Sequence, residues 1–184
     1  NGAAEPDEIV VPAGLHGRAF DAAHDRLISL DGQTGRIVAL NPADGRTSVL
    51  HQLGRPVLSL TDGPTPGTLF LAADRLYEFD LTTRVLTPRS PPGIGELGGL
   101  TYDAERNVIW GIEPTARRLV SLHPVTGRVV QSFHVDASAP MPVDLAFDTK
   151  RRLLLGTRSS FLQVDRKTGQ TSLAHFVPAF GSKA

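Results

Sequence analysis

Cysteine is absent from this sequence, tryptophan occurs once, and no hydrophobic run reaches the roughly 20 residues that a membrane-spanning helix needs. The lack of cysteine excludes disulfides, thiolate metal sites and cysteine nucleophiles. Lysine plus arginine and aspartate plus glutamate balance at 19 each, so no net charge attracts nucleic acid or an anionic membrane. We therefore expect neither nucleic-acid binding nor membrane insertion.

Sequence motifs of the common enzyme classes are absent as well. The chain has no G-x-S-x-G, H-E-x-x-H or P-loop pattern. The run GIGELG at 93–98 matches G-x-G-x-x-G, but a strand rather than a helix follows it, so it lacks the context of a dinucleotide site. The chain does not begin with Met, as expected after removal of a signal peptide or after trimming, and we expect an extracytoplasmic location.

What the 184-residue sequence does contain is a fourfold repeat. A short apolar element ends in aspartate at four places, Asp21, Asp62, Asp103 and Asp148, at intervals of 41, 41 and 45 residues. A second set of segments (RIVALNPADGR, RLYEFDLTTR, RLVSLHPVTGR and FLQVDRKTGQ) aligns on Asn41, Asp80, His123 and Asp165, at intervals of 39, 43 and 42 residues. Two independent anchors thus agree on one period.

Each repeat is predicted to be four short strands separated by polar turns. In the third repeat the strands are expected near 98–103, 107–112, 117–122 and 127–135, because apolar residues alternate there with polar ones. Repeats of about 40 residues with four strands are typical of propeller blades. We predict an all-β, four-bladed β-propeller of four-stranded antiparallel blades in a single domain, with blades near 14–54, 55–92, 93–138 and 139–178.

The repeat pattern, in the form GLxFD…L…D..TG.V, resembles the blades of the YVTN, NHL and PQQ-like propeller superfamily over about residues 14–177. The resemblance implies the propeller fold but no single activity, because those families include enzymes, scaffolds and sensors. Trp110 is the only tryptophan, so the tryptophan-docking pattern typical of quinone-binding repeats is missing. We expect no dedicated quinone site.

Closure of four blades has three alternatives. A closed four-blade ring, and hence a monomer, is favoured, and residues 8–13 (EIVVPA) have the strand character to pair with the last blade and close it. Pairing with a second copy into eight blades, giving a dimer, is one alternative. The other alternative is that these four blades are part of something longer.

One end of the propeller is the predicted site. Loops that enter the first strands and loops that join second to third strands share this end, and their residues differ from blade to blade. His16 with Asp144 or Glu96 is a candidate catalytic acid–base pair. The candidate ligand-binding residues are Arg55, Glu113, Arg117 and Arg158.

The four repeat aspartates form a second candidate group. Asp21, Asp62, Asp103 and Asp148 are weak metal candidates that would hold a divalent cation in the central channel, since carboxylates suit calcium and magnesium. The competing interpretation is that each one bonds the backbone of its own hairpin turn. Three histidines, His51, His134 and His175, recur on the fourth strands, which are too far apart to share a metal.

Two functions remain open at this point. The first is a non-catalytic binding module that presents one loop face and a central channel to a protein or small-molecule ligand. The second is a propeller lyase or hydrolase with a site at the channel mouth that uses a histidine and carboxylates, with or without a metal ion. The enzyme requires His16 within about 3 Å of a carboxylate or a metal ligand in a concave pocket.

Overall fold

Sixteen strands make up the part of the chain that the computed structural model describes, which is residues 14–176 except 92, 93, 95, 137 and 138. They are β1 (Leu15–Asp21), β2 (Arg26–Asp31), β3 (Arg36–Leu40), β4 (Thr47–Gln52), β5 (Ser59–Asp62), β6 (Thr68–Ala72), β7 (Leu76–Asp80), β8 (Leu86–Pro88), β9 (Gly99–Asp103), β10 (Val108–Glu113), β11 (Arg118–Leu122), β12 (Val129–His134), β13 (Pro142–Phe147), β14 (Leu153–Thr157), β15 (Ser160–Val164) and β16 (Thr171–Phe176). Among these residues there is no helix that could span a membrane.

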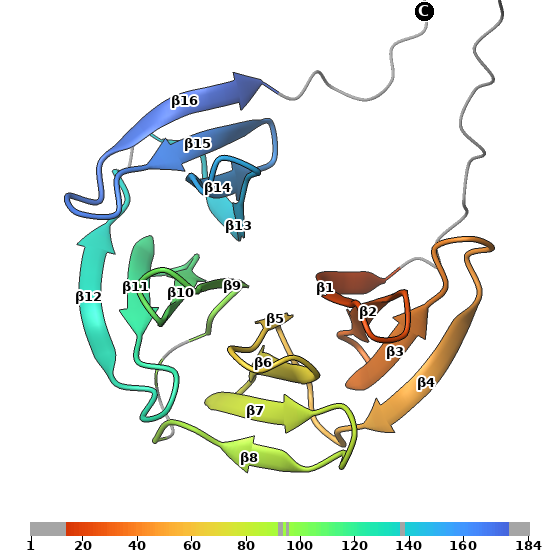
Figure 1. Cartoon of the computed structure of the whole chain (residues 1–184). Coiled ribbons are helices and arrows are strands. Elements are labelled where there is room, and N and C mark those ends of the chain that lie inside the picture. Colours follow the sequence, from red (N-terminus) through yellow and green to blue (C-terminus); the bar gives the residue numbers. More distant parts are fainter. Residues whose placement is uncertain (1–13, 92–93, 95, 137–138, 177–184) are drawn as a thin grey trace, which may run out of the picture.

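The strands form four antiparallel sheets, each built from four consecutive strands paired in chain order. Figure 1 shows the sheets arranged about a central axis, with β1, β5, β9 and β13 innermost and β4, β8, β12 and β16 on the rim. This confirms the predicted four-bladed β-propeller. The strands of the third blade also begin and end within two residues of the predicted limits.

The core lies between neighbouring blades. The two middle strands of the second blade have a neighbouring blade on either face, so the run 69–72 in β6 is buried at every residue. Separate hydrophobic clusters join the first blade to the second (with Ile28 and Phe79), the second to the third (with Phe70 and Ile109) and the third to the fourth (with Trp110 and Leu155). These three clusters hold the innermost strands in a fixed order around the axis.

The first and fourth blades are not joined by such a cluster within the described residues, and Figure 1 shows their ribbons well separated. The predicted closing strand at 8–13 lies outside those residues. Closure of the ring and the number of copies therefore stay predictions.

Candidate functional site

A cavity of about 810 Å³ lies at one end of the innermost strands. Its walls come from all four blades, since residues of β1, β5, β9 and β13 line it together with the loop after β2. The polar side chains in the lining are those of His16, Gln33, Ser59 and Asp144, and most of the rest is aliphatic or glycine. The site therefore combines apolar walls with a few convergent polar groups, which is typical of small-molecule sites.

The innermost strands of the first and fourth blades each have an irregularity next to a cavity residue, after His16 in β1 and before Asp144 in β13. The register of β1 against β2 shifts between His16 and Arg18, and that of β13 against β14 shifts between Pro142 and Asp144. The pairings of β5 with β6 and of β9 with β10 show no such shift. Because a bulge redirects a strand and its side chains, these shifts set the first and fourth blades apart at the cavity.

Glycines make room for both side chains. A Cβ atom on Gly32 would lie 2.6 Å from Cδ2 and 2.8 Å from Nε2 of His16. A Cβ atom on Gly99 would lie 2.7 Å from Oδ1 of Asp144. Contacts this short do not occur, so larger residues at these two positions would displace the polar groups of the cavity.

The two candidate residues share the cavity without forming the expected pair. Within the described part of the chain, no hydrogen bond or ion pair joins His16 to Asp144 or to any other carboxylate. Asp144 instead accepts a hydrogen bond from the backbone N–H of Leu145, at 2.8 Å from Oδ1. His16 and Asp144 therefore line one cavity, but in the described part of the chain they do not form a hydrogen-bonded acid–base pair with each other.

The other residues predicted near the axis lie elsewhere. Glu96 is exposed and is not part of the cavity lining. Arg55 forms an ion pair with Asp74, 3.0 Å between Nη1 and Oδ1, and its guanidinium carbon lies 5.2 Å from the centre of the Tyr77 ring. Arg55 therefore joins the loop before β5 to the turn before β7, within one blade.

The remaining ligand-binding candidates are spread over two blades. Glu113 is buried and bound by the Arg118 guanidinium, with 2.8 Å between Nη2 and Oε1. Arg117 donates hydrogen bonds to the backbone carbonyls of Asp136 and Ala139, so it fixes the loop that leads to the fourth blade. Arg158 lies exposed in the turn between β14 and β15. None of these residues lines the cavity.

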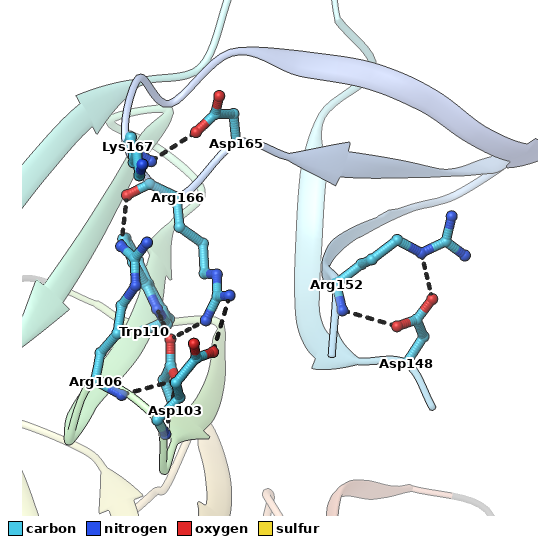
Figure 2. A network of polar contacts seen from close by, with 9 residues as sticks. Asp103, Arg106, Trp110, Asp148, Arg152, Asp165, Arg166 and Lys167 are labelled. Atoms are coloured by element: carbon cyan, nitrogen blue, oxygen red, sulfur yellow. Dashed lines mark hydrogen bonds and ion pairs between the residues drawn. The ribbon is translucent and has the colours of Figure 1, made fainter. Parts of the chain in front are cut away.

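The four repeat aspartates have partners of their own. Asp103 and Asp148 accept hydrogen bonds from backbone N–H groups of their own turns, as the competing interpretation predicted, and each also binds an arginine (Figure 2). Asp21 binds Arg26 and His24 instead. Asp62 accepts a backbone hydrogen bond from Phe20 in the first blade. No group of three or more metal-ligating residues is assembled within the described residues.

Sequence reasoning missed two kinds of cavity residue. Gln33 and Ser59 line the site, but a turn glutamine and a strand serine carry no signal of function by themselves. The bulges were missed too, although the only glycine within β1, Gly17, which adopts a φ of 57°, is the kind of residue that marks one.

Comparison with known proteins identifies the fold and nothing finer. No protein-family model matches the chain, and no curated protein matches it. Among solved structures, it resembles one of a nidogen/laminin complex, with a TM-score of 0.68 at 13% identity, over 86% of this chain and 64% of that chain. The shared feature is the propeller.

Two further structures show the same relationship. The propeller domain of Cps50 (Swd1) from Myceliophteria thermophila has a TM-score of 0.62 at 16% identity, over 89% of this chain and 57% of that one. Virginiamycin B lyase from Staphylococcus aureus has a TM-score of 0.63 at 14% identity, over 91% and 57%. The chain thus spans less than two thirds of the length of each of these structures. The specific YVTN, NHL or PQQ-like family stays a prediction.

Proposed function

We propose that this propeller is a non-catalytic binding module that holds a small molecule in the cavity lined by His16 and Asp144. The observation that carries the proposal is that, among the described residues, a register shift between the first and second strands occurs only in the two blades that supply His16 and Asp144 to the cavity. The volume of about 810 Å³ falls within the range of known ligand sites. A structural neighbour bears the name of a complex, the nidogen/laminin structure, which agrees with a binding role for the fold.

The composition of the cavity suggests the kind of ligand. Aliphatic walls from Leu60, Leu100 and Leu145 favour an apolar body, while His16 and Asp144 provide polar contacts at its edge. A carboxylate at the site favours a ligand with hydrogen-bond donors or a positive charge. The proposed ligand is therefore an amphipathic small molecule with at least one donor group.

A cavity-filling variant tests the proposal. Ala146 lines the cavity and is exposed, so Ala146→Trp should fill the site without disturbing the core. Ala174→Trp, also at an exposed alanine but on the rim strand β16, is the matched control. The protein would be incubated with a small-molecule library and examined by native mass spectrometry. Ligands retained by the wild type and by Ala174→Trp but lost from Ala146→Trp would support the site, and equal retention by all three would refute it.

A lyase or hydrolase is the second candidate function, because a histidine and a carboxylate line one cavity and one structural neighbour is a lyase. The same incubation separates the two functions. A binding module returns its ligand with unchanged mass. An enzyme releases products of altered mass, and His16→Gln or Asp144→Asn should then stop their formation.

The same native mass spectra report the number of copies, for which a monomer remains our proposal and an eight-bladed dimer the alternative. They would also reveal a bound divalent cation. The extracytoplasmic location stays a prediction from the sequence, which fractionation of the source cells would test.

A further inference from the structure

A second cavity, of about 390 Å³, lies between the first two blades, away from the site described above. It borders Asp21 at the end of β1, whereas His16 stands near the start of that strand. Five residues of extended strand span roughly 16 Å, so the two cavities are distinct. The groove is lined by His24, Arg26 and Leu50 of the first blade and by Phe79, Leu81 and Arg84 of the second, among others.

The side chain of Asp21 at this groove has different hydrogen-bond partners from its counterparts in the third and fourth blades. In the third and fourth blades the repeat aspartate accepts hydrogen bonds from the backbone of its own turn. The side chain of Asp21, only 4% exposed, instead lies with Oδ2 2.8 Å from Nδ1 of His24 and 2.9 Å from Nε of Arg26. The carboxylate of Asp21 thus contacts side chains, including the imidazole of His24, where Asp103 and Asp148 bond backbone N–H groups of their turns. This contact with an imidazole is a departure from the repeat.

The orientation of the imidazole follows from this contact. Burial alone would raise the pKa of Asp21, but hydrogen bonds from Arg26 and His24 outweigh it and lower that pKa. An ionised carboxylate only accepts hydrogen bonds, so Nδ1 of His24 is the donor. Nε2 is then left to face outward, on a side chain that is 63% exposed.

Arg84 breaks the repeat pattern on the other wall. The turns between third and fourth strands have glycine at one aligned position in three blades, with φ values of 70° for Gly45, 61° for Gly127 and 74° for Gly169. In the second blade Arg84 occupies that position with a φ of 60°. A left-handed conformation costs a residue with a side chain roughly 1 kcal/mol or more. Arginine at this position therefore destabilises the turn relative to glycine, and it places a guanidinium beside the groove.

Nothing in the described fold uses that guanidinium. The backbone N–H of Arg84 donates to the carbonyl of Asp80, but its guanidinium has no hydrogen-bond or ion-pair partner among the residues that the structure describes. The groove beside it also offers apolar surface, from the half-buried side chains of Leu50 and Leu81. A cation without a partner, an oriented imidazole and an apolar floor therefore meet in one cavity.

We propose that this groove is a binding site for a small organic anion, in which a carboxylate or phosphate group is carried on an apolar body. The planar guanidinium of Arg84 binds the anionic group through paired hydrogen bonds. His24 provides the second polar contact through Nε2, and Asp21 positions its ring. The apolar body packs on Leu50 and Leu81.

Arg84→Gly is an unusually clean test, because three of the four equivalent turns already have glycine there. The variant removes the cation and should fold as well as the wild type or better. Arg128→Ala, at an exposed arginine next to the glycine of the third turn, is the matched control. His24→Gln tests the second contact.

The probes are benzoate and phenyl phosphate, with neutral benzamide for comparison, and affinity is followed by NMR titration of the full chain. We expect saturable binding of at least one anion and weaker binding of benzamide. Arg84→Gly should lower the anion affinity about tenfold or more, His24→Gln should lower it less, and Arg128→Ala should leave it unchanged. Preference for one of the two anions would identify the charged group.

Three results would overturn the proposal. They are no saturable binding of either anion in the millimolar range, equal affinity for benzamide, or an affinity that Arg84→Gly leaves unchanged. Ala146→Trp, which fills the cavity lined by His16 and Asp144, should not affect binding of these probes. The proposal for this groove and the proposed function of that cavity are therefore tested independently.

Discussion

Arg166, in the turn after β15 of the fourth blade, reaches Asp103 of the third blade, with 2.7 Å between Nη1 and Oδ2 (Figure 2). The same carboxylate oxygen lies 3.3 Å from the indole Nε1 of Trp110, and Arg166 also contacts Glu105 at 3.2 Å. The side chain of Asp103 is 3% exposed and that of Arg166 18%. A nearly buried ion pair between two blades is thus built on one of the repeat aspartates.

Loss of Arg166 should destabilise the propeller. Arg166→Met leaves the buried carboxylate of Asp103 without its charged partner, so we expect the free energy of unfolding to fall by about 3 kcal/mol. Arg152→Met is the matched control, because Arg152 pairs with Asp148 at a more exposed position and should cost below about 1 kcal/mol. Equilibrium urea unfolding measures both, and equal losses would contradict the role assigned to Asp103.

Acid should remove the contribution of Asp103. Its burial acts to raise the pKa, but hydrogen bonds from Arg166 and Trp110 outweigh this and hold the pKa below its ordinary value. The stability it contributes is therefore fully present above the unfolded pKa of about 3.9 and is lost as the pH falls through the lower folded pKa. In urea unfolding between pH 7 and pH 2, Asp103→Asn should be less stable than the wild type at pH 7 and should lose less stability in acid.

The contribution of Asp62 to stability should change with pH in the opposite direction to that of Asp103. The residue as a whole is exposed, yet burial of its carboxyl raises the pKa, against a weaker opposing hydrogen bond from the backbone of Phe20. Its charged form then disfavours folding, and this penalty appears as the pH rises through the unfolded pKa and the higher folded pKa. At pH 7, Asp62→Asn should be more stable than the wild type by a few tenths of a kcal/mol. A loss of stability in thermal unfolding would argue against this assignment.

Trp110 should dominate the packing between the third and fourth blades. It is fully buried and lies stacked on Phe133, with 6.2 Å between ring centroids. Trp110→Ala should lower the free energy of unfolding by about 3–5 kcal/mol, because it leaves a large cavity. Phe161→Ala, at an aromatic residue that is 39% exposed, should cost far less. Far-ultraviolet circular dichroism during urea unfolding follows both variants, and similar costs would refute the packing role.

Gly127 should be far less tolerant of substitution than Gly67. Both adopt positive φ, 61° and 82°, so alanine at either one costs about 1 kcal/mol in backbone conformation. A Cβ atom on Gly127 would also lie 2.2 Å from Cβ of Ser90 in the second blade, while one on Gly67 meets nothing within 4 Å. Gly127→Ala should therefore cost at least about 1 kcal/mol more than Gly67→Ala in thermal unfolding.

Part of the candidate site was readable from the sequence. His16 and Asp144 lie five and four residues before the repeat aspartates Asp21 and Asp148, so the repeat puts both near the same end of the innermost strands, which the propeller geometry then brings together. The structure places both residues at one cavity, whereas Arg55, also predicted near the axis, and Glu113 and Arg117, predicted further out at the same end, do not line it. Those three have other partners, because loop conformation, which the repeat does not encode, decides where a long side chain ends.

Sequence alone determined the architecture. The alternation of apolar and polar residues in a strand and the glycine of a turn are local features, and both recur along the chain with the period of the repeat. The individual uses of equivalent positions were decided by tertiary structure. Asp21 orients an imidazole, Asp103 binds an arginine of the next blade, and Arg84 stands where three other turns have glycine. These differences depend on side chains that meet across blade boundaries, and residues 60 or more apart in the sequence, such as Asp103 and Arg166, carry no local signal that they will touch.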